Sequence, residues 1–428
     1  KKGWGEYMMN KALICGNGFS MNFDTDFGNI MDRLYESHLN LKRYGEFNII
    51  SNIPAFKAKG IENYNAVLNY LKPYSKEKLY KLFEEALNFG KIILSNNEFL
   101  EELKLKGNVK ELTINVSEIS ILKSLIEDWE KYGLRKINIE YITILVYFYY
   151  QLDDEKLKEL DLYYNGFVKL LRIGDINKYC IGDNSDRILG DSLYNGFTTY
   201  YRLLFSISIF NNGKAISLDN LNKISEINLN KVTKWLEGFE CIFTLNYDNI
   251  IESIIPSKNI IHLHGKFELS DSKQICNYQS LRMKYKDTYV SFSDILIGDY
   301  IYNKTTRGLI NVLASQQYKK VNNKIVENTF KHIEREIKNN EISEIWIFGL
   351  NVNNDQHIIR NILTGLYWAK INNPVIKYSY FTEDDRKNFE KIFKECLTFG
   401  DDLLEYINTN VKIEFISTQN ILNENFCK

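Results

Sequence analysis

Two short segments place an asparagine and a histidine where their side chains could act together on a bound ligand. Asn246 lies in Thr244-Leu-Asn-Tyr-Asp248, directly after an apolar run, and His264 lies in His262-Leu-His-Gly265, after another. A histidine titrates near neutrality and suits a general base. An amide can donate to and accept from a ribose hydroxyl or a water. These residue types predict a site that orients hydroxyl groups and moves a proton.

Other interpretations of the same residues stay open. Alternation along a strand predicts that His262 and His264 face the same side, so a metal-binding pair is conceivable, although no Cys/His/Asp cluster lies near them in the sequence. A core histidine is as consistent with the pattern as a catalytic one. Asp248 could simply cap a helix that begins near Asn249.

Two glycine segments could hold phosphates or sugars. Gly16-Asn-Gly-Phe-Ser20 follows the apolar run Lys11-Ala-Leu-Ile-Cys15 and opens a candidate helix. Glycines let the backbone approach a pyrophosphate, and a helix N-terminus favours an anion. A tight strand-to-helix turn explains the segment equally well. In Phe348-Gly349-Leu-Asn-Val-Asn-Asn-Asp355, Asn351 and Asp355 could meet a second ribose or cap the next helix.

The elements that must position these segments form an α/β pattern. Short apolar runs that predict strands buried on both faces cover 11–16, 241–245, 259–263, 344–349 and 375–380. Helical patterns at 326–338, 356–369 and 383–397 alternate with the later strands, which predicts a parallel sheet covered on both sides. The alternating segment 411–416 is expected at a sheet edge. All four polar segments follow strand ends, where an open α/β sheet binds its ligand.

The fold expected is therefore a Rossmann-like parallel sheet with a large α-helical insertion. Apolar residues recur at helical spacing from about residue 40 to 235. We predict that 11–35 and 236–428 form the Rossmann-like domain and that 36–235 form the insertion. A length of 428 residues suits two or three domains.

Composition excludes several classes of protein. Lys and Arg total 54 against 55 Asp and Glu, a net charge of −1, so nucleic-acid binding is not expected. Six cysteines occur without a CxxC spacing, which predicts no zinc site and free thiols of a reducing, cytoplasmic compartment. We expect no signal peptide. The longest apolar run, 141–150, is half the ~20 residues of a membrane span, so no membrane association is expected.

The polar segments together resemble a known family. Thr244-Leu-Asn-Tyr-Asp248 resembles the T-Q-N-I-D motif of sirtuins, His262-Leu-His-Gly265 resembles their H-G motif, and Gly16-Asn-Gly-Phe-Ser20 resembles their G-A-G-x-S loop. The similarity is closer to the sirtuin-like NAD-cleaving domains of bacterial antiphage defence proteins. The opening G-N-G-F and the helical insertion also resemble AbiH-type abortive-infection proteins. The resemblance covers roughly 11–35 and 240–370.

The resemblance implies NAD as substrate and attack at the nicotinamide ribose, with Asn246 and His264 as the catalytic pair and without a metal. It assigns NAD binding to Gly16, Asn17, Gly18, Phe19, Ser20, Thr244, Tyr247, Asp248, Gly265, Gly349, Asn351 and Asp355. The chain lacks the four-Cys zinc module and the P-D-F-R segment of sirtuins, beside which they grip an acyl-lysine peptide. Water is then the expected nucleophile, which makes a NAD glycohydrolase.

Such an enzyme would kill its host if unregulated, so we expect an abortive-infection effector. A phage-derived or companion protein would be its trigger. The helical insertion would serve as sensor, lid or oligomerisation surface, and a homo-oligomer is expected. Two alternatives remain: a catalytically silent module of the same fold that senses a nucleotide or partner, and a different transferase or nuclease-like enzyme.

Overall fold

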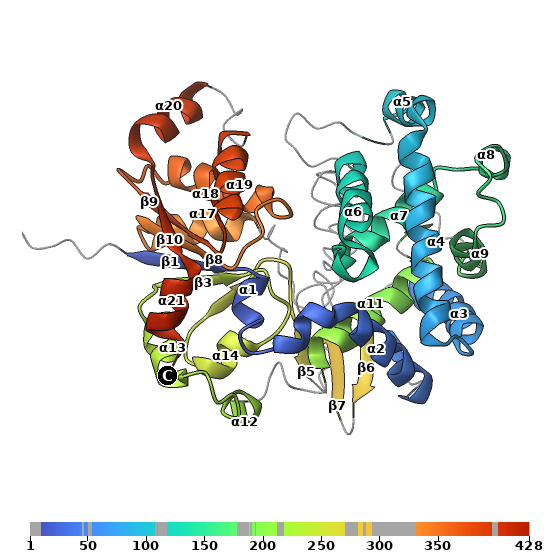
Figure 1. Cartoon of the computed structure of the whole chain (residues 1–428), viewed down its shortest axis with the longest axis horizontal. Coiled ribbons are helices and arrows are strands. Elements are labelled where there is room, and N and C mark those ends of the chain that lie inside the picture. The colour runs from blue at the N-terminus through green and yellow to red at the C-terminus, as the bar shows by residue number, and fades with distance from the viewer. Residues whose placement is uncertain are drawn as a thin grey trace, which may run out of the picture. The chain divides into compact units, whose positions relative to one another are not determined.

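A six-stranded, all-parallel sheet organises one part of the chain in the computed structural model (Figure 1). Its strands are β1 (Lys11–Cys15), β3 (Cys241–Thr244), β4 (Ile260–His262), β8 (Glu344–Phe348), β9 (Val375–Tyr380) and β10 (Lys412–Ser417). Their spatial order is β10-β9-β8-β1-β3-β4. Counted along the chain, this is 6-5-4-1-2-3, the strand order of the doubly wound dinucleotide-binding fold. The predicted Rossmann-like α/β class is confirmed.

The structure describes most of the chain. Described are residues 10–44, 47–49, 54–107, 109, 118–177, 188, 191–192, 194–211, 218–269, 281–285, 288–292, 330–395 and 401–427. All predicted site residues lie within these ranges. Cys180, Cys276 and Cys396 lie outside them, so the expectation that they are free thiols concerns residues beyond the described ranges. Cys15, Cys241 and Cys427 are free.

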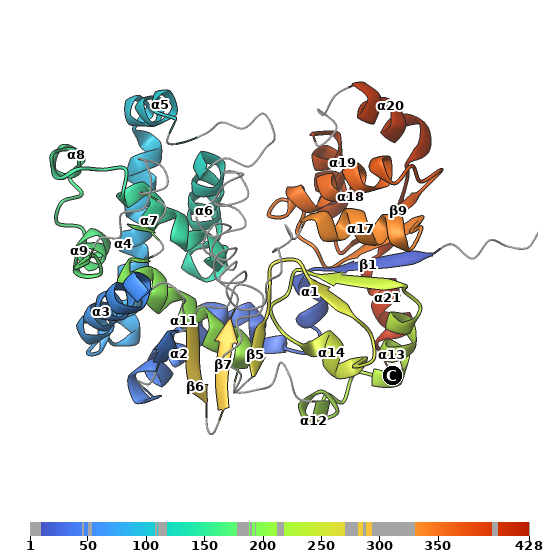
Figure 2. The same cartoon turned by 180° about the vertical axis from the view of Figure 1, so that it is seen from behind.

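Alternating side chains of the central strand enter two separate hydrophobic cores. Ala12 and Ile14 of β1 pack into one core, and Leu13 and Cys15 pack into the other. Because both faces of the strand are buried from Ala12 to Cys15, these four residues are all apolar, which is why they show no polar alternation. The three-layer arrangement is visible from both sides in Figures 1 and 2.

Helices cover both faces of the sheet. One core includes residues of α17 (Phe330–Asn339), α18 (Gln356–Trp368), α19 (Glu383–Glu395) and α20 (Asp401–Asn410). The opposite core includes residues of α1 (Asn17–Ser20), α12 (Leu218–Leu221), α13 (Leu229–Glu237), α14 (Ile250–Ile254) and α21 (Thr418–Asn425). The predicted helices of the C-terminal half are confirmed within the described residues. Residues 326–329 of the first predicted helix lie outside them.

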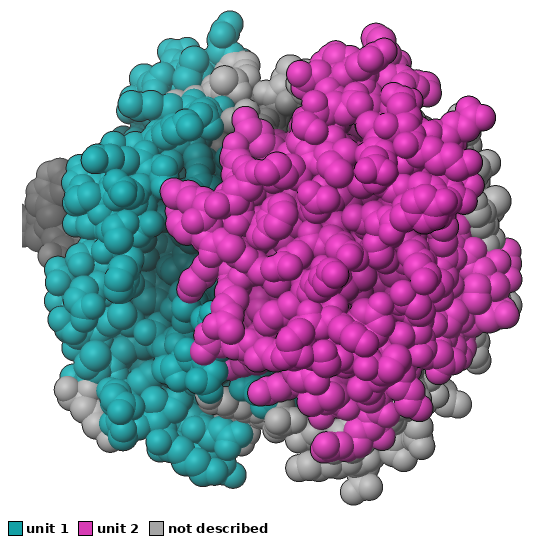
Figure 3. Space-filling model, turned by 45° about the vertical axis from the view of Figure 1, so that its right-hand side comes forward, with its two compact units in different colours: residues 1–28, 210–266, 327–428 teal, residues 29–209, 267–326 magenta. Residues whose placement is uncertain are grey.

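The chain divides into two compact units, coloured separately in Figure 3. Unit 1 contains residues 1–28, 210–266 and 327–428, and therefore the parallel sheet. Unit 2 contains residues 29–209 and 267–326. These boundaries differ from the expected 36 and 236. The division also places residues 267–326 in unit 2, although the sequence pattern had suggested a single helical insertion at 36–235.

Unit 2 is mostly helical but has a sheet of its own. Among its described residues the α-helices are α2 (Ile30–Tyr44), α3 (Pro54–Leu71), α4 (Lys76–Ser95), α5 (Asn97–Leu105), α6 (Glu118–Tyr132), α7 (Thr143–Tyr149), α8 (Asp154–Glu159), α9 (Gly166–Ile173) and α11 (Gly196–Phe210). Four antiparallel strands, β2 (Phe47–Ile49), β6 (Leu281–Tyr285), β7 (Thr288–Phe292) and β5 (Phe267–Leu269), form the sheet in that order. A short strand near residue 48 thus pairs with a segment more than two hundred residues later.

Two expectations about single elements have different outcomes. β10 lies at the sheet edge, as predicted for 411–416. β4 is the opposite edge strand and is only half-buried, so the prediction that 259–263 is buried on both faces was wrong.

The apolar run in 141–150 forms the buried helix α7. Among the described residues, no helix is long and apolar enough to cross a membrane.

Candidate functional site

The four polar segments all follow carboxyl ends of strands in the parallel sheet. Residues 16–20 follow β1, 244–248 end β3, 262–265 end β4 and 349–355 follow β8. Since β8, β1, β3 and β4 are neighbours in this order, their carboxyl ends lie along one edge. The strand order also reverses between β1 and β8, which is where doubly wound sheets bind nucleotides.

The glycines of two of these segments pack against one another. Gly16 N donates to Phe348 O at 2.9 Å, and Gly18 N donates to Gly349 O at 2.9 Å. A Cβ atom on Gly16 would lie 2.4 Å from Gly349 O, and one on Gly349 would lie 2.7 Å from Phe19 N. Gly349 also has a φ of +67°. Mutual backbone contact at the switch point therefore explains these glycines. The two N–H groups are not available to a phosphate.

Asn246 joins the end of β3 to the loop after β1. Its Nδ2 donates to Gly16 O at 3.0 Å and to Ser20 Oγ at 2.8 Å, and its backbone N donates to Thr244 Oγ1 at 3.1 Å. Gly16 O can only accept, which fixes the orientation of the amide. Both side-chain donors are therefore used within the fold. What Asn246 can offer a ligand is its Oδ1, as an acceptor.

Ser20 connects Asn246 to a buried carboxyl group. Ser20 Oγ donates to Asp248 Oδ2 at 2.6 Å, while Ile250 N donates to Asp248 Oδ1 at 3.1 Å. Asp248 thus accepts from the first turn of α14 and also holds the loop after β1. The N-cap residue of α14 is Asn249, so Asp248 is not the N-cap that the capping interpretation expected. Burial raises the pKa of Asp248 to about 6, although the Ser20 and Ile250 hydrogen bonds oppose the shift.

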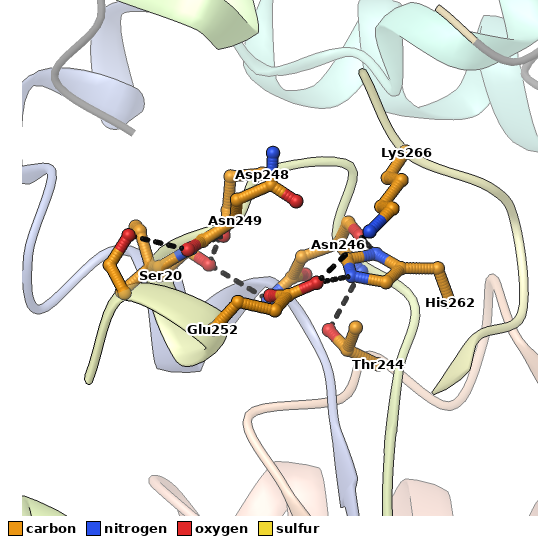
Figure 4. A network of polar contacts seen from close by, with 10 residues as sticks. Ser20, Thr244, Asn246, Asp248, Asn249, Glu252, His262 and Lys266 are labelled. Carbon is orange, nitrogen blue, oxygen red and sulfur yellow. Dashed lines mark hydrogen bonds and ion pairs between the residues drawn. The ribbon is translucent and has the colours of Figure 1, made fainter. Parts of the chain in front are cut away.

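His262 is held between a carboxylate and a peptide carbonyl, as Figure 4 shows. Its Nδ1 lies 2.8 Å from Asn246 O, and its Nε2 lies 2.6 Å from Glu252 Oε1. Lys266 Nζ lies 3.5 Å from the same Glu252 oxygen. Burial would raise the pKa of Glu252, but the hydrogen bond and charge of His262 outweigh it and hold this pKa below the usual value.

His264 lies two residues beyond β4, in the turn that precedes Gly265. The strand ends at His262, so the expectation that His264 ends a strand and shares a face with His262 by alternation was wrong. Gly265 has a φ of +87°, which carries the chain away from the strand direction. His264 is 3% exposed, and burial lowers its pKa to about 4. Its ring lies 6.3 Å from that of the buried Tyr247.

The remaining predicted residues are less closely connected to this cluster. Asn351 is exposed, and its Oδ1 accepts from Asn353 N at 3.1 Å in a local turn. Asp355 occupies the N-cap position of α18 without a side-chain capping bond. Asn17 is the exposed member of its loop, whereas Phe19 is fully buried in the core. Among the described residues, no group of three or more His, Cys, Asp or Glu side chains could hold a metal ion.

Sequence reasoning missed Glu252 and Lys266. Glu252 is the single acidic residue in Asn249-Ile-Ile-Glu-Ser-Ile-Ile255, and an acid in an otherwise apolar helix face needs a buried partner. The sequence therefore contained a signal that could have identified Glu252. The link between Ser20 and Asp248 spans 228 residues and has no local signature.

Comparisons with protein-family models, with curated proteins and with solved structures found no match to this chain.

Proposed function

We propose that this protein binds a NAD-type dinucleotide along the carboxyl edge of its parallel sheet and hydrolyses the nicotinamide–ribose bond. The observation that carries the proposal is the joint placement of Asn246 and His264. Both follow adjacent strands, β3 and β4, of a sheet with dinucleotide-binding strand order. The resemblance of the same segments to sirtuin-like NAD-cleaving domains supports it independently.

Asn246 would act as a hydrogen-bond acceptor. With its donors bound to Gly16 O and Ser20 Oγ, its Oδ1 is oriented by the fold before any ligand arrives. It would accept a hydrogen bond from the attacking water or from a ribose hydroxyl. An oriented acceptor of this kind lowers the barrier by positioning, because the reacting groups do not have to be ordered in the transition state.

His264 would act as the general base. Its pKa of about 4 means that it is neutral at neutral pH and can take a proton. The bond between ribose C1′ and the nicotinamide nitrogen breaks, and its electron pair neutralises the pyridinium. The water oxygen bonds to C1′, and the proton it loses goes to His264 and then to solvent. The products are nicotinamide, ADP-ribose and a proton.

The pyrophosphate requires other donors than the resemblance suggests. Gly16 N and Gly18 N are bonded to the segment after β8, so they would not contact a phosphate without rearrangement. Asn17 is exposed in the same loop, and its side-chain amide can donate to a phosphate oxygen. α1 has four residues, which is too short to contribute a strong helix dipole. We therefore assign the phosphate contact to Asn17.

Release of nicotinamide from NAD by the purified chain tests the proposal. The wild type should produce equal amounts of nicotinamide and ADP-ribose, and His264→Ala and Asn246→Ala should each abolish this while the protein stays folded. Loss of a general base lowers a rate by about 10²–10⁴-fold. If both variants cleave NAD normally, neither residue is catalytic and the proposal fails.

A second candidate is a catalytically silent module that binds a nucleotide. The use of both Asn246 donors within the fold and the burial of His264 favour it, because both features also describe purely structural residues. This candidate predicts NAD binding by calorimetry with no nicotinamide release at any enzyme concentration.

The setting we propose is that of an abortive-infection effector acting on the cytoplasmic NAD pool. The chain passes from unit 1 to unit 2 directly after Gly28 and again after Lys266, two residues past His264. Unit 2 would bind a phage-derived or companion protein, or a second copy of the chain. Sedimentation with and without NAD tests self-association, and a concentration-independent monomer would contradict it.

A further inference from the structure

His262 is the first histidine of the segment, and both of its ring nitrogens face oxygen atoms. Its Nδ1 faces Asn246 O at 2.8 Å, and a peptide carbonyl can only accept, so Nδ1 carries a hydrogen. Its Nε2 faces Glu252 Oε1 at 2.6 Å. The ring is therefore held at both ends, by the Asn246 carbonyl and by the Glu252 carboxyl group.

The bond from His262 completes a set of contacts around Asn246. Thr244 Oγ1 accepts from Asn246 N, and Gly16 O and Ser20 Oγ accept from Asn246 Nδ2. The His262 bond holds the remaining backbone polar atom, the carbonyl oxygen. His262 reaches it from β4, where it pairs in register with Thr244. Among the described residues, nothing donates to Asn246 Oδ1, which is the atom that the reaction would use.

We propose that His262 and Glu252 form a positioning pair: Glu252 orients the His262 ring through Nε2, and His262 Nδ1 donates to the Asn246 carbonyl and fixes this peptide so that Oδ1 points at the ligand. This inference rests on the proposed function for its effect on catalysis. Lys266 Nζ lies beside the same Glu252 oxygen, and Asp248 is the other acidic group near the ring.

The competing explanation is purely structural, since a His262–Glu252 contact also ties the edge strand β4 to α14. Two substitutions separate the explanations. In His262→Asn the amide nitrogen takes the place of Nδ1 and keeps the donor to Asn246 O, but the bond to Glu252 is lost. In His262→Gln the amide nitrogen takes the place of Nε2 and keeps the bond to Glu252, but the donor to Asn246 O is lost.

A positioning role predicts that Gln is the more damaging replacement. His262→Gln should lower kcat by about 100-fold with little change in KM, since misplacement of a reacting group by about 1 Å costs that much. His262→Asn should recover most of the kcat lost in His262→Gln. His332→Gln, on α17 of the same unit, is the control and should cleave NAD at the wild-type rate. Equal kcat in the two His262 variants, or a higher kcat in His262→Gln, would overturn the positioning role.

A ring-nitrogen NMR spectrum of histidine-labelled protein gives a measurement that does not depend on activity. The His262 signals, assigned by their absence in His262→Asn, should show a hydrogen on Nδ1, the nitrogen that faces the Asn246 carbonyl. In Glu252→Ala the Nδ1 signal should shift, because the ring loses the group that orients it. If the wild type releases no nicotinamide, the proposed function fails but this spectrum still decides the inference, and a His262 ring without a hydrogen on Nδ1 in the wild type would reject it.

Discussion

The side-chain amide of Asn246 donates to the carbonyl oxygen of Gly16 at 3.0 Å, which ties the end of β3 to the loop after β1 across 230 residues of sequence. A second donor of the same amide reaches Ser20 Oγ. The residue with the strongest sequence signal for chemistry is therefore also a structural link between neighbouring strands. Under the proposed function its two roles would use different atoms, Nδ2 for the fold and Oδ1 for a ligand.

Asn246→Asp should destabilise the protein although it preserves shape. A carboxylate oxygen would replace Nδ2 and face Gly16 O, so two acceptors would meet in a buried site. Leaving a buried acceptor unsatisfied costs about 1–3 kcal/mol, more when a charge is involved. We expect a lower free energy of unfolding by urea denaturation and loss of nicotinamide release.

Asn423→Asp is the matched control for this change. Asn423 is exposed on α21, and its Oδ1 accepts from Gln419 Nε2, a role that a carboxylate also fills. It should leave both stability and cleavage unchanged. Equal stability of the two variants would show that the Asn246 donors contribute little to the fold.

The pH profile of cleavage should reflect the low pKa of His264. Burial lowers that pKa to about 4, so the base stays neutral well below the ordinary histidine range. The value of kcat/KM should therefore hold to about pH 5 and fall only as pH approaches 4. A fall centred near 6.5, the ordinary value of a histidine, would mean that His264 is exposed to solvent or is not the base.

His264 should also make stability depend on pH. Between about 6.5 and 4 the unfolded chain binds a proton at His264 and the folded chain does not, so stability falls as pH falls through this window. Over this whole window the free energy of unfolding should fall by about 3 kcal/mol, because each pKa unit corresponds to about 1.36 kcal/mol. In His264→Gln this contribution should vanish, so the difference in unfolding free energy from the wild type should change between pH 7 and pH 4. A difference in unfolding free energy that is the same at both pH values would contradict a buried, neutral His264.

Sequence patterns located the strands because strands buried on both faces must be apolar. Ala12 and Leu13 of β1, for example, enter opposite cores. Because the apolar runs end where the sheet ends, they also predicted that the polar segments lie at its carboxyl edge. Alternation of apolar and polar residues placed β10 at a sheet edge, but an apolar run does not by itself distinguish an edge strand from a central one. β4 gave the same signal as a central strand although it is an edge strand.

Contacts between distant segments account for the rest of what the sequence could not show. The glycines at 16 and 349 were recognised, but their reason, mutual backbone contact, depends on which strands are neighbours. The pairing of β2 with β6 is equally non-local, so the return of 267–326 to unit 2 had no periodic signature. Glu252 was recognisable in principle as an acid among isoleucines, but its partner His262 follows only from the geometry.

Gly349→Ala should destabilise unit 1 strongly. The new Cβ would lie 2.7 Å from Phe19 N, and the residue would have to keep a φ of +67°. Strain of this kind costs on the order of 1–3 kcal/mol. Gly28→Ala is the control, because nothing lies within 4 Å of its added Cβ. Thermal unfolding should show a lower Tm for the first variant and an unchanged or slightly higher Tm for the second. Similar Tm values would contradict the close contact of the two loops.

Ser20→Ala should destabilise the protein more at neutral pH than at acid pH. Burial raises the pKa of Asp248 to about 6, and the Ser20 hydroxyl opposes this shift by donating to the carboxylate. A carboxyl group with a raised folded pKa favours folding at low pH, and that contribution is lost as pH rises through the folded pKa. Without Ser20 the pKa rises further, so the cost of the charged form grows above about pH 6 and is small where Asp248 is protonated.

A hydrogen bond to a charged group contributes about 1.5–3 kcal/mol, against about 1 for a neutral one, so the loss of unfolding free energy should be larger near pH 7.5 than near pH 5. Ser253→Ala on α14 is the matched control, since Ser253 Oγ donates to the neutral carbonyl of Asn249 at 2.9 Å. Its effect should not depend on pH. Urea denaturation of both variants at the two pH values measures the difference, and a loss in Ser20→Ala that is the same at both would show that Asp248 is not charged in the folded protein near neutrality.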